Sequence, residues 1–393
     1  MISEIRQKFN NEFNEKRYTE YLDDLNSILK YPTDFRVCET PLFLSLDLTN
    51  DLIKACDNII DQLNEKEFLL RSEDAVPGNL RVPNDSGPPM FLQIDFAITK
   101  SGDKYTPKLI ELQAFPSLYG FQVFLNEMIR KHFEIPVGFQ NYFNGLNKNS
   151  YSGLLTECIV GKQDPENVIL LEIEPEKQKT RIDFAATEAL TGITTVCLSK
   201  IKKTGKRLFY IKDGKETDIK RIYNRVIFDE LERKKPEFDF NFKDEIDVEW
   251  AGHPNWFFKI SKFSLPLLKG DYVPKCYFLN EIKNYPDNLS DFVLKPLFSF
   301  AGLGVEIEVT KEKLDAIENK SNYILQQKVD YAPLINTPDG FSKAEIRMMF
   351  LQPEGSGKPL LVNNLIRTSK GKMMGVDFNK NKTWIGSSIA YHP

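Results

Sequence analysis

The chain has 393 residues, 41% of them hydrophobic and 27% charged, which is typical of a globular protein too long for one ordinary core, so we expect two or three packed units. A net charge of −4 argues against a nucleic-acid surface, and no apolar run is long enough to span a membrane. Five scattered cysteines without a CxxC pair, three distant histidines and an N-terminus without a secretory signal predict a cytoplasmic protein whose metal, if any, is a hard cation bound by oxygen.

Residues 1–89 are expected to form a helical N-terminal addition. Apolar residues recur at helical spacing over residues 3–30, and a second helix is expected to begin near Thr49, a plausible N-cap. The stretch "RVPNDSGPPM" (81–90) is rich in turn residues and separates this helical part from the strands expected after residue 90.

Residues 90–150 begin with an expected antiparallel hairpin. Strands at 91–98 and 107–113 are joined by a turn at 101–103. This hairpin can place Asp95 and Glu111 on neighbouring strands with both side chains on one face. Two carboxylates with the amide oxygen of Gln113 suit octahedral Mg²⁺, although the same pattern also fits an exposed strand face.

Residues 151–252 contain a predicted βαβ unit, and therefore a parallel sheet. "NVILLEI" (167–173) and "ITTVCLS" (193–199) are short apolar runs suited to buried strands, and "RIDFAATEALTG" (181–192) between them is typical of a helix. A hairpin turning at 213–214 comes next, and Asn224 and Arg225 stand at the end of the following strand. That position suits ligand binding, and a surface salt bridge is as good an explanation for Arg225.

Residues 253–393 include the segment "FVLKPLFSFAGLGVEIEV" (292–309). Lys295 ends an apolar strand, and the next loop has small residues that let backbone N–H groups approach an anion: Ser299, Gly302 and Gly304. A lysine beside such a loop suits a triphosphate. The pattern is not a Walker A loop, and the segment alone slightly favours a glycine-containing hairpin with a surface lysine, because such hairpins are common.

The segments after this loop add further candidates for the same site. "YILQQKVD" (323–330) is an apolar strand leading into a polar connector, a hinge whose backbone can pair with adenine. In "KAEIRMMFL" (343–351), Glu345 and Arg347 share one face of a strand. Arg367 comes at a strand end and Asn379 in a later loop, and the planar guanidinium of arginine suits a phosphoryl group that changes charge during transfer.

Together these segments resemble the ATP-grasp superfamily, over roughly residues 90–393. The shared features are the lysine with its small-residue loop, the hinge, the D/E-x-R strand, and the later arginine and asparagine. The acids that usually come after them are missing at the C-terminal end, whereas Asp95 and Glu111-Leu-Gln113 resemble those acids earlier in the chain. This order resembles the circularly permuted, glutathionylspermidine synthase-like group, with Gln113 where asparagine is usual.

The resemblance implies an α/β fold of α+β lobes: an ATP-grasp fold preceded by a Rossmann-like domain. Residues 90–150 would be the permuted segment with the metal ligands, 151–252 the Rossmann-like domain and 253–393 the nucleotide-binding lobes. "HPNWFFKISKF" (253–263) would supply a phosphate-binding lysine, either Lys259 or Lys262. The implied ATP-binding residues are Lys259, Lys295, Ser299, Gly302, Gly304, Gln326, Gln327, Val329 and Asp330; the implied Mg²⁺ ligands are Asp95, Glu111 and Gln113; and the implied catalytic residues are Arg347, Arg367 and Asn379.

The implied function is an ATP- and Mg²⁺-dependent ligase. It would activate a small-molecule or peptide carboxylate as an acyl phosphate and pass the acyl group to an amine or similar nucleophile. Two alternatives stay open: an ATP-grasp kinase that releases a phosphorylated product, and a non-catalytic module that uses ATP to order a partner surface. The sequence predicts neither a nucleic-acid partner nor a membrane partner.

Overall fold

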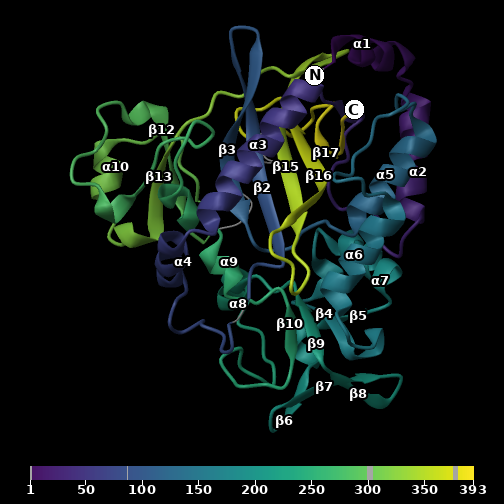
Figure 1. Cartoon of the computed structure of the whole chain (residues 1–393), viewed down its shortest axis with the longest axis vertical. Coiled ribbons are helices and arrows are strands. Elements are labelled where there is room, and N and C mark those ends of the chain that lie inside the picture. The colour runs from purple at the N-terminus through teal and green to yellow at the C-terminus, as the bar shows by residue number, and fades with distance from the viewer. Residues whose placement is uncertain (1, 86, 299–303, 375–378) are drawn as a thin grey trace.

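The largest element of the protein is a six-stranded antiparallel sheet at its centre (Figure 1). The computed structural model describes residues 2–85, 87–298, 304–374 and 379–393. The sheet has the strand order β17-β16-β15-β2-β3, and β14 also pairs with β15. Its strands are β2 (Phe91–Ser101), β3 (Lys104–Gln113), β14 (Ile335–Thr337), β15 (Gly340–Leu351), β16 (Leu360–Ser369) and β17 (Gly386–Ser388). The expected hairpin at 91–113 is therefore confirmed, and its partner strand comes from residues 340–351.

One face of this large sheet is apolar and carries the main core. Ile94 and Phe96 of β2 lie opposite Met348 and Ile346 of β15, and all four are buried. Helix α3 (Leu46–Leu63) runs along the sheet (Figure 1) and adds apolar residues such as Leu52 to the same core. The alternation of side chains along each strand therefore turns the polar residues of β2, β3, β15 and β16 to the opposite face.

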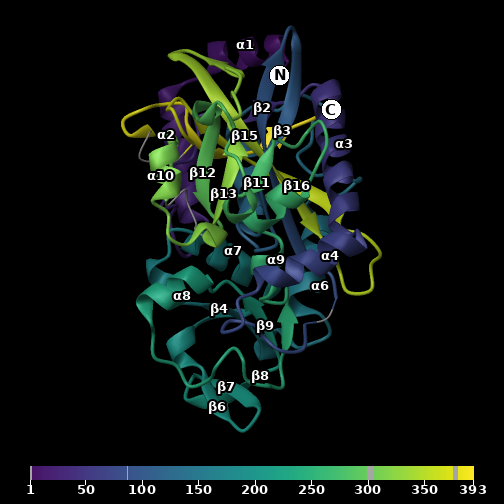
Figure 2. The same cartoon turned by 90° about the vertical axis from the view of Figure 1, so that its left-hand side faces the viewer.

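A small antiparallel sheet stands beside the large one, at the left of Figure 1 and in front of it in Figure 2. It has the order β11-β13-β12, with β11 (Cys276–Phe278), β12 (Phe292–Pro296) and β13 (Tyr323–Gln327). Leu294 and Leu325 on its outer face form a separate core with Leu314 of α10 (Lys311–Asp315). The pairing register puts Val293, Lys295, Ile324 and Gln326 on its other, inner face.

The expected βαβ unit is confirmed in a parallel four-stranded sheet at the bottom of Figure 1. The strand order is β10-β9-β4-β5, with β4 (Val168–Glu172), β5 (Thr194–Cys197), β9 (Arg221–Asn224) and β10 (Glu249–Ala251). Helix α7 (Arg181–Thr191) connects β4 to β5 and ends at Gly192, which adopts the left-handed conformation at φ 75°. The next strands, β6 (Lys202–Thr204), β7 (Arg207–Lys212) and β8 (Lys215–Ile219), form a three-stranded antiparallel sheet.

The single helix expected over residues 3–30 is wrong, because the chain forms two helices there. Helix α1 (Ser3–Glu12) is separated from α2 (Glu15–Ser27) at Asn14, whose side chain accepts hydrogen bonds from the N–H groups of Lys16 and Arg17. Asparagine is a strong N-cap, so it starts a new helix at this point. The next strand, β1 (Leu42–Phe43), pairs in parallel with β18 (Ala390–Tyr391), which brings the two ends of the chain together.

The remaining helices have between 4 and 13 residues. They are α4 (Lys66–Ser72), α5 (Phe121–His132), α6 (Lys148–Val160), α8 (Phe228–Lys234) and α9 (Trp256–Lys259), and a 3₁₀ segment comes after α9 at Lys262–Leu267. Among the described residues, no helix is both long and apolar enough to cross a membrane.

Candidate functional site

The polar face of the large sheet gathers most of the charged residues that the sequence singled out. Asp95 lies opposite Glu111 of β3 on one side and opposite Arg347 of β15 on the other. Glu345 of β15 lies opposite Arg367 of β16. Directly opposed residues of neighbouring strands share a face, so these five side chains form one group, which we call the charged face.

An ion-pair network joins the acids and arginines of the charged face. The guanidinium of Arg347 donates from Nε to Oδ1 and from Nη2 to Oδ2 of Asp95, both at 2.7 Å. Arg367 Nη2 lies 3.2 Å from Oδ2 of Asp95 and also pairs with Glu345. The side chains of Asp95 and Glu345 are only 2% and 3% exposed, whereas that of Arg367 is 42% exposed. Arg367 is therefore a cation that is held from behind by buried acids and presented to solvent.

Two lysines from residues 262–295 approach the same face at its β3 edge. Lys262 Nζ lies 3.4 Å from Oε1 of Glu111. Lys295, on the inner face of the small sheet, donates to the carbonyl oxygen of Ile110 at 3.4 Å. Burial lowers the pKa of Lys295 below its usual value, and the nearby Glu111 carboxylate opposes that shift. Lys295 thus lies near Glu111, although the lysine is almost two hundred residues further along the chain.

The four residues expected to form the hinge differ in whether they reach the inner face of the small sheet. Gln326 of β13 is 2% exposed, donates to the Ile110 carbonyl at 3.5 Å, and leaves its buried Oε1 without a hydrogen-bond donor among the described residues. Gln327 is exposed and its backbone N–H already binds the carbonyl of Lys275. Val329 and Asp330 lie in the connector beyond the strand. Only Gln326 of these four therefore reaches the inner face beside Lys295.

Lys259 and Asn379 do not join the charged face. The ammonium group of Lys259 pairs with Asp85 and Glu73, which come from the N-terminal segment. Of the two lysines left open by the sequence, Lys262 is therefore the one beside Glu111. Asn379 is buried, and its Oδ1 accepts from Ser369 Oγ and from the backbone N–H groups of residues 370 and 371. Its side chain therefore holds residues 369–373.

The loop after Lys295 is described only in part. Ser299 and Gly302 lie outside the described residues. Gly304 is exposed at φ 74°, and a Cβ there would lie 2.9 Å from Cγ of Pro296. This position therefore needs glycine for two reasons: its left-handed backbone and the nearby proline ring.

The residues that support the arginines from behind were not predicted from the sequence. Gln93 accepts from Arg347 Nη1 at 3.1 Å and from Gln113 Nε2 at 2.6 Å. Glu345 accepts from the hydroxyl of Tyr331 at 2.8 Å. Gln93 stands two residues before Asp95, so the alternation of β2 was a signal that it shares the face of Asp95; no sequence pattern pointed to Tyr331.

The Mg²⁺ ligands expected from the sequence fit only in part. Both oxygens of Asp95 are held by Arg347, so this carboxylate serves the arginines. Glu111 is 30% exposed, and Gln113, two residues along the same strand, donates its amide to Gln93, while its oxygen accepts no hydrogen bond from the residues that the structure describes. Among the described residues, no group of three or more His, Cys, Asp or Glu side chains is arranged as a metal site. One carboxylate and one amide oxygen still suit Mg²⁺, which usually completes its octahedron with phosphates and water.

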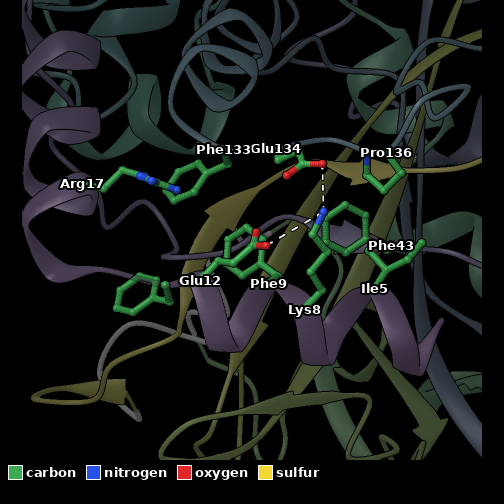
Figure 3. A pocket seen from close by; sticks show the side chains of 10 residues that line it. Ile5, Lys8, Phe9, Glu12, Arg17, Phe43, Phe133, Glu134 and Pro136 are labelled. Atoms are coloured by element: carbon green, nitrogen blue, oxygen red, sulfur yellow. Dashed lines mark hydrogen bonds and ion pairs between the residues drawn. The ribbon is translucent and has the colours of Figure 1, made fainter.

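Two hollows of the structure lie away from this site. One of about 240 Å³ is lined by Phe9, Phe43 and Phe133, with an ion pair of 2.8 Å between Lys8 and Glu134 at its rim (Figure 3). Another of about 220 Å³ lies among apolar residues near Trp256. Residues of the charged face line neither hollow. The candidate site is therefore defined by the charges of its side chains and by the register of its strands, not by a cavity.

The polar residues at the end of β9 are committed to the interior. Arg225 Nη1 pairs with Asp183 Oδ2 at 2.7 Å, and both side chains are buried. Asp183 also accepts the backbone N–H groups of Leu118 and Phe121. This ion pair therefore ties the parallel sheet to the start of α5.

Comparison with solved structures shows a likeness of fold. No family model and no curated protein matches the sequence. The structure is similar to that of a glutathione synthetase-like effector from Globodera pallida in its apo form, with a TM-score of 0.56 over 96% of each chain. The fold is glutathione synthetase-like. Because the identity is 10%, this likeness concerns the fold alone, and the mixed α/β architecture expected from the sequence is confirmed.

Proposed function

We propose that the charged face and the inner face of the small sheet together bind ATP with Mg²⁺, and that the protein is an ATP-dependent ligase. Lys262, Lys295 and Arg367 would bind the phosphates, and Gln326 would contribute to the nucleotide pocket from the hinge strand. The convergence of Glu111, Lys262 and Lys295 carries the proposal, because these residues come from three separate segments and local folding gives no reason for their meeting.

The charge of the site supports an anionic ligand. Lys262, Lys295, Arg347 and Arg367 supply four positive charges, and Asp95, Glu111 and Glu345 supply three negative ones, so the set carries one net positive charge. Buried charges are costly unless they are paired, which explains why Asp95 and Glu345 accompany the arginines. The exposed part of Arg367 then suits a phosphate of the nucleotide.

Mg²⁺ would be held by Glu111 and Gln113 together with the phosphates, and when bound it would neutralise phosphate charge. We reassign Asp95 from metal ligand to the residue that orients Arg347 and Arg367. A permuted chain order is supported by the pairing of β2 with β15, since the segment with Glu111 completes a sheet built from residues 335–388. The permutation remains part of this proposal.

The chemistry would be direct phosphoryl transfer. An oxygen of the substrate carboxylate would attack the γ-phosphorus, the bond to the bridging oxygen would break, and ADP would leave. The neutral amine would then attack the acyl carbon, the bond from that carbon to the phosphate oxygen would break, and phosphate would leave while the amine nitrogen loses one proton to water. The lysines and Arg367 would hold the transferring group in line and offset its charge, a role of positioning and electrostatics.

A non-catalytic nucleotide-binding module is the second candidate. It is favoured by the complete engagement of Asp95 with Arg347, which leaves the site with a single carboxylate for the metal. Such a module would bind nucleotide without turning it over.

ADP release separates these candidates. The protein would be incubated with Mg²⁺·ATP and mixtures of carboxylic acids and amines, and ADP would be followed by a coupled assay. A ligase requires ADP release that depends on both a carboxylate and an amine. A kinase would need no amine, and binding of ATP without ADP release in any mixture would favour the non-catalytic module.

A further inference from the structure

Tyr331 connects the hinge to the charged face. It lies in the connector between β13 of the small sheet and β14 of the large sheet. Its hydroxyl donates to Oε2 of Glu345 at 2.8 Å, and the backbone N–H of the next residue, Ala332, donates to the carbonyl of Ile98 at 2.8 Å. The connector is therefore fastened to both β15 and β2 directly after it leaves the small sheet.

Glu345 is shared between this tyrosine and an arginine. Its side chain is 3% exposed, and while Oε2 accepts from Tyr331, Oε1 pairs with Nη2 of Arg367. The same Nη2 lies 3.2 Å from Asp95. Arg367 is therefore fixed from behind by two carboxylates, and one of these is fixed in turn by the hydroxyl of Tyr331.

The hydroxyl of Tyr331 stays protonated and therefore acts as a hydrogen-bond donor. Burial, with a further contribution from Glu345, raises the pKa of Tyr331 well above its usual value, so the phenol keeps its proton at every working pH. Without this donor, a buried oxygen of Glu345 would lose its partner and could swing toward another nitrogen of Arg367. The exposed guanidinium would then lose its fixed direction.

We propose that Tyr331 is a positioning residue, which acts through Glu345 to aim Arg367 at the terminal phosphate of a bound nucleoside triphosphate. This inference rests on the proposed nucleotide site. It links the hinge to the phosphates, because the segment that leaves β13 beside Gln326 also fixes the orientation of Arg367.

The test compares Tyr331→Phe with a matched control. The substitution removes only the hydroxyl and keeps the ring. In the control, Tyr285→Phe, a tyrosine hydroxyl is removed outside the charged face, where it donates to Asp315 Oδ1 at 3.0 Å and accepts from Lys320 Nζ at 2.8 Å. The probes are ADP and the non-hydrolysable analogue in which an imido group replaces the β,γ-bridging oxygen of ATP, each with Mg²⁺, in isothermal titration calorimetry.

We expect Tyr331→Phe to weaken the triphosphate analogue about tenfold, on the scale of one hydrogen bond to a charged group, and to change ADP by less than about twofold. The control should bind both nucleotides as the wild type does. An unchanged affinity for the analogue, or an equal loss for both nucleotides, would overturn the positioning role. Wild-type protein that binds neither nucleotide would instead overturn the proposed function on which the role rests.

Glu345→Gln keeps the inference testable if Tyr331→Phe does not fold. This variant should show the same selective loss for the triphosphate, and an unchanged preference for the analogue over ADP would count against the inference. Where both variants fold, the double variant should bind the analogue no more weakly than Glu345→Gln alone, because both changes interrupt one route. Additive losses would show that Tyr331 acts independently of Glu345, contrary to the inference.

Discussion

Asp95 and Glu111 lie opposite one another on β2 and β3, yet their surroundings give them different tasks. Asp95 is 2% exposed and bound on both oxygens by Arg347, whereas Glu111 is 30% exposed and makes one longer contact with Lys262. A strand pattern can place two acids on one face, but it does not show which of the two will form an ion pair with an arginine of another strand. The sequence therefore predicted their juxtaposition and not their roles.

The first prediction separates these roles by stability. Asp95→Ala would leave Arg347, whose side chain is 11% exposed, without its carboxylate, so the free energy of unfolding should fall by roughly 3 kcal/mol or more. Glu111→Gln removes one charge at a partly exposed position and should change the free energy of unfolding by less than about 1 kcal/mol. Urea denaturation measures both. Equal losses in the two variants would contradict the assignment of Asp95 as the residue that holds the arginines.

Lys295 gives the second prediction. Lys295→Ala should weaken binding of Mg²⁺ and an ATP analogue by roughly 1.5–3 kcal/mol, because one charge-assisted contact to a phosphate is lost. Lys283→Ala, which removes an exposed lysine between β11 and β12, is the control. Calorimetry in which both variants match the wild type would return Lys295 to the role of a lysine beside an ordinary hairpin.

At the scale of elements, local patterns predicted pieces well and their partners poorly. The hairpin of β2 and β3 and the β4-α7-β5 unit are expected from periodicity and turn residues. The pairing of β2 with β15 is a contact between distant segments, and periodicity within one strand does not specify its neighbour. Helix starts were misplaced for a related reason: α3 begins at Leu46 after Ser45, whose Oγ accepts from Leu48 N–H, so Thr49 lies inside the helix.

Strand β4 carries the third prediction, at Glu172. This carboxyl is 4% exposed, and burial raises its pKa to about 8, although the backbone N–H of Ile173 and the charge of Arg225 act in the opposite direction. Since the ordinary pKa is 4.5, the folded state holds a proton that the unfolded state has lost between pH 4.5 and about 8. The contribution of this group to stability is thus complete below pH 4.5 and is lost as pH rises to about 8.

Glu172→Gln should remove this dependence. Wild-type protein should lose free energy of unfolding between about pH 6 and pH 8, by at most about 1.4 kcal/mol per pH unit, and the variant should lose less. Glu174→Gln is the control: its ion pairs with Lys177 and Lys234 lower the pKa of Glu174, so its own contribution is lost only in acid. Denaturation curves of equal pH slope in the wild type and Glu172→Gln would mean that Glu172 is ionised in the folded protein.

At the scale of the whole molecule, length and composition predicted two or three packed units, and this division stays a prediction. The described residues form sheets of six, four and three strands, beside the sheet of β6–β8 and the pair of β1 and β18. The charged face lies where the large and small sheets meet. Its side chains and the lysines beside it come from residues 93–113, 262–295 and 345–367. A family resemblance suggested this meeting before the structure did. Composition alone could not, because the segments are distant and the relevant contacts are few. The likeness to a glutathione synthetase-like effector is likewise seen only in three dimensions, at 10% identity.

The central claim is that the two sheets form one site for ATP and Mg²⁺. A crystal structure of the protein with Mg²⁺ and a non-hydrolysable ATP analogue tests it most directly. We expect the triphosphate to lie between Lys295, Lys262 and Arg367, with the metal on Glu111 and a phosphate oxygen. A nucleotide bound away from the charged face, or crystals that take up no nucleotide at millimolar concentration, would contradict the claim.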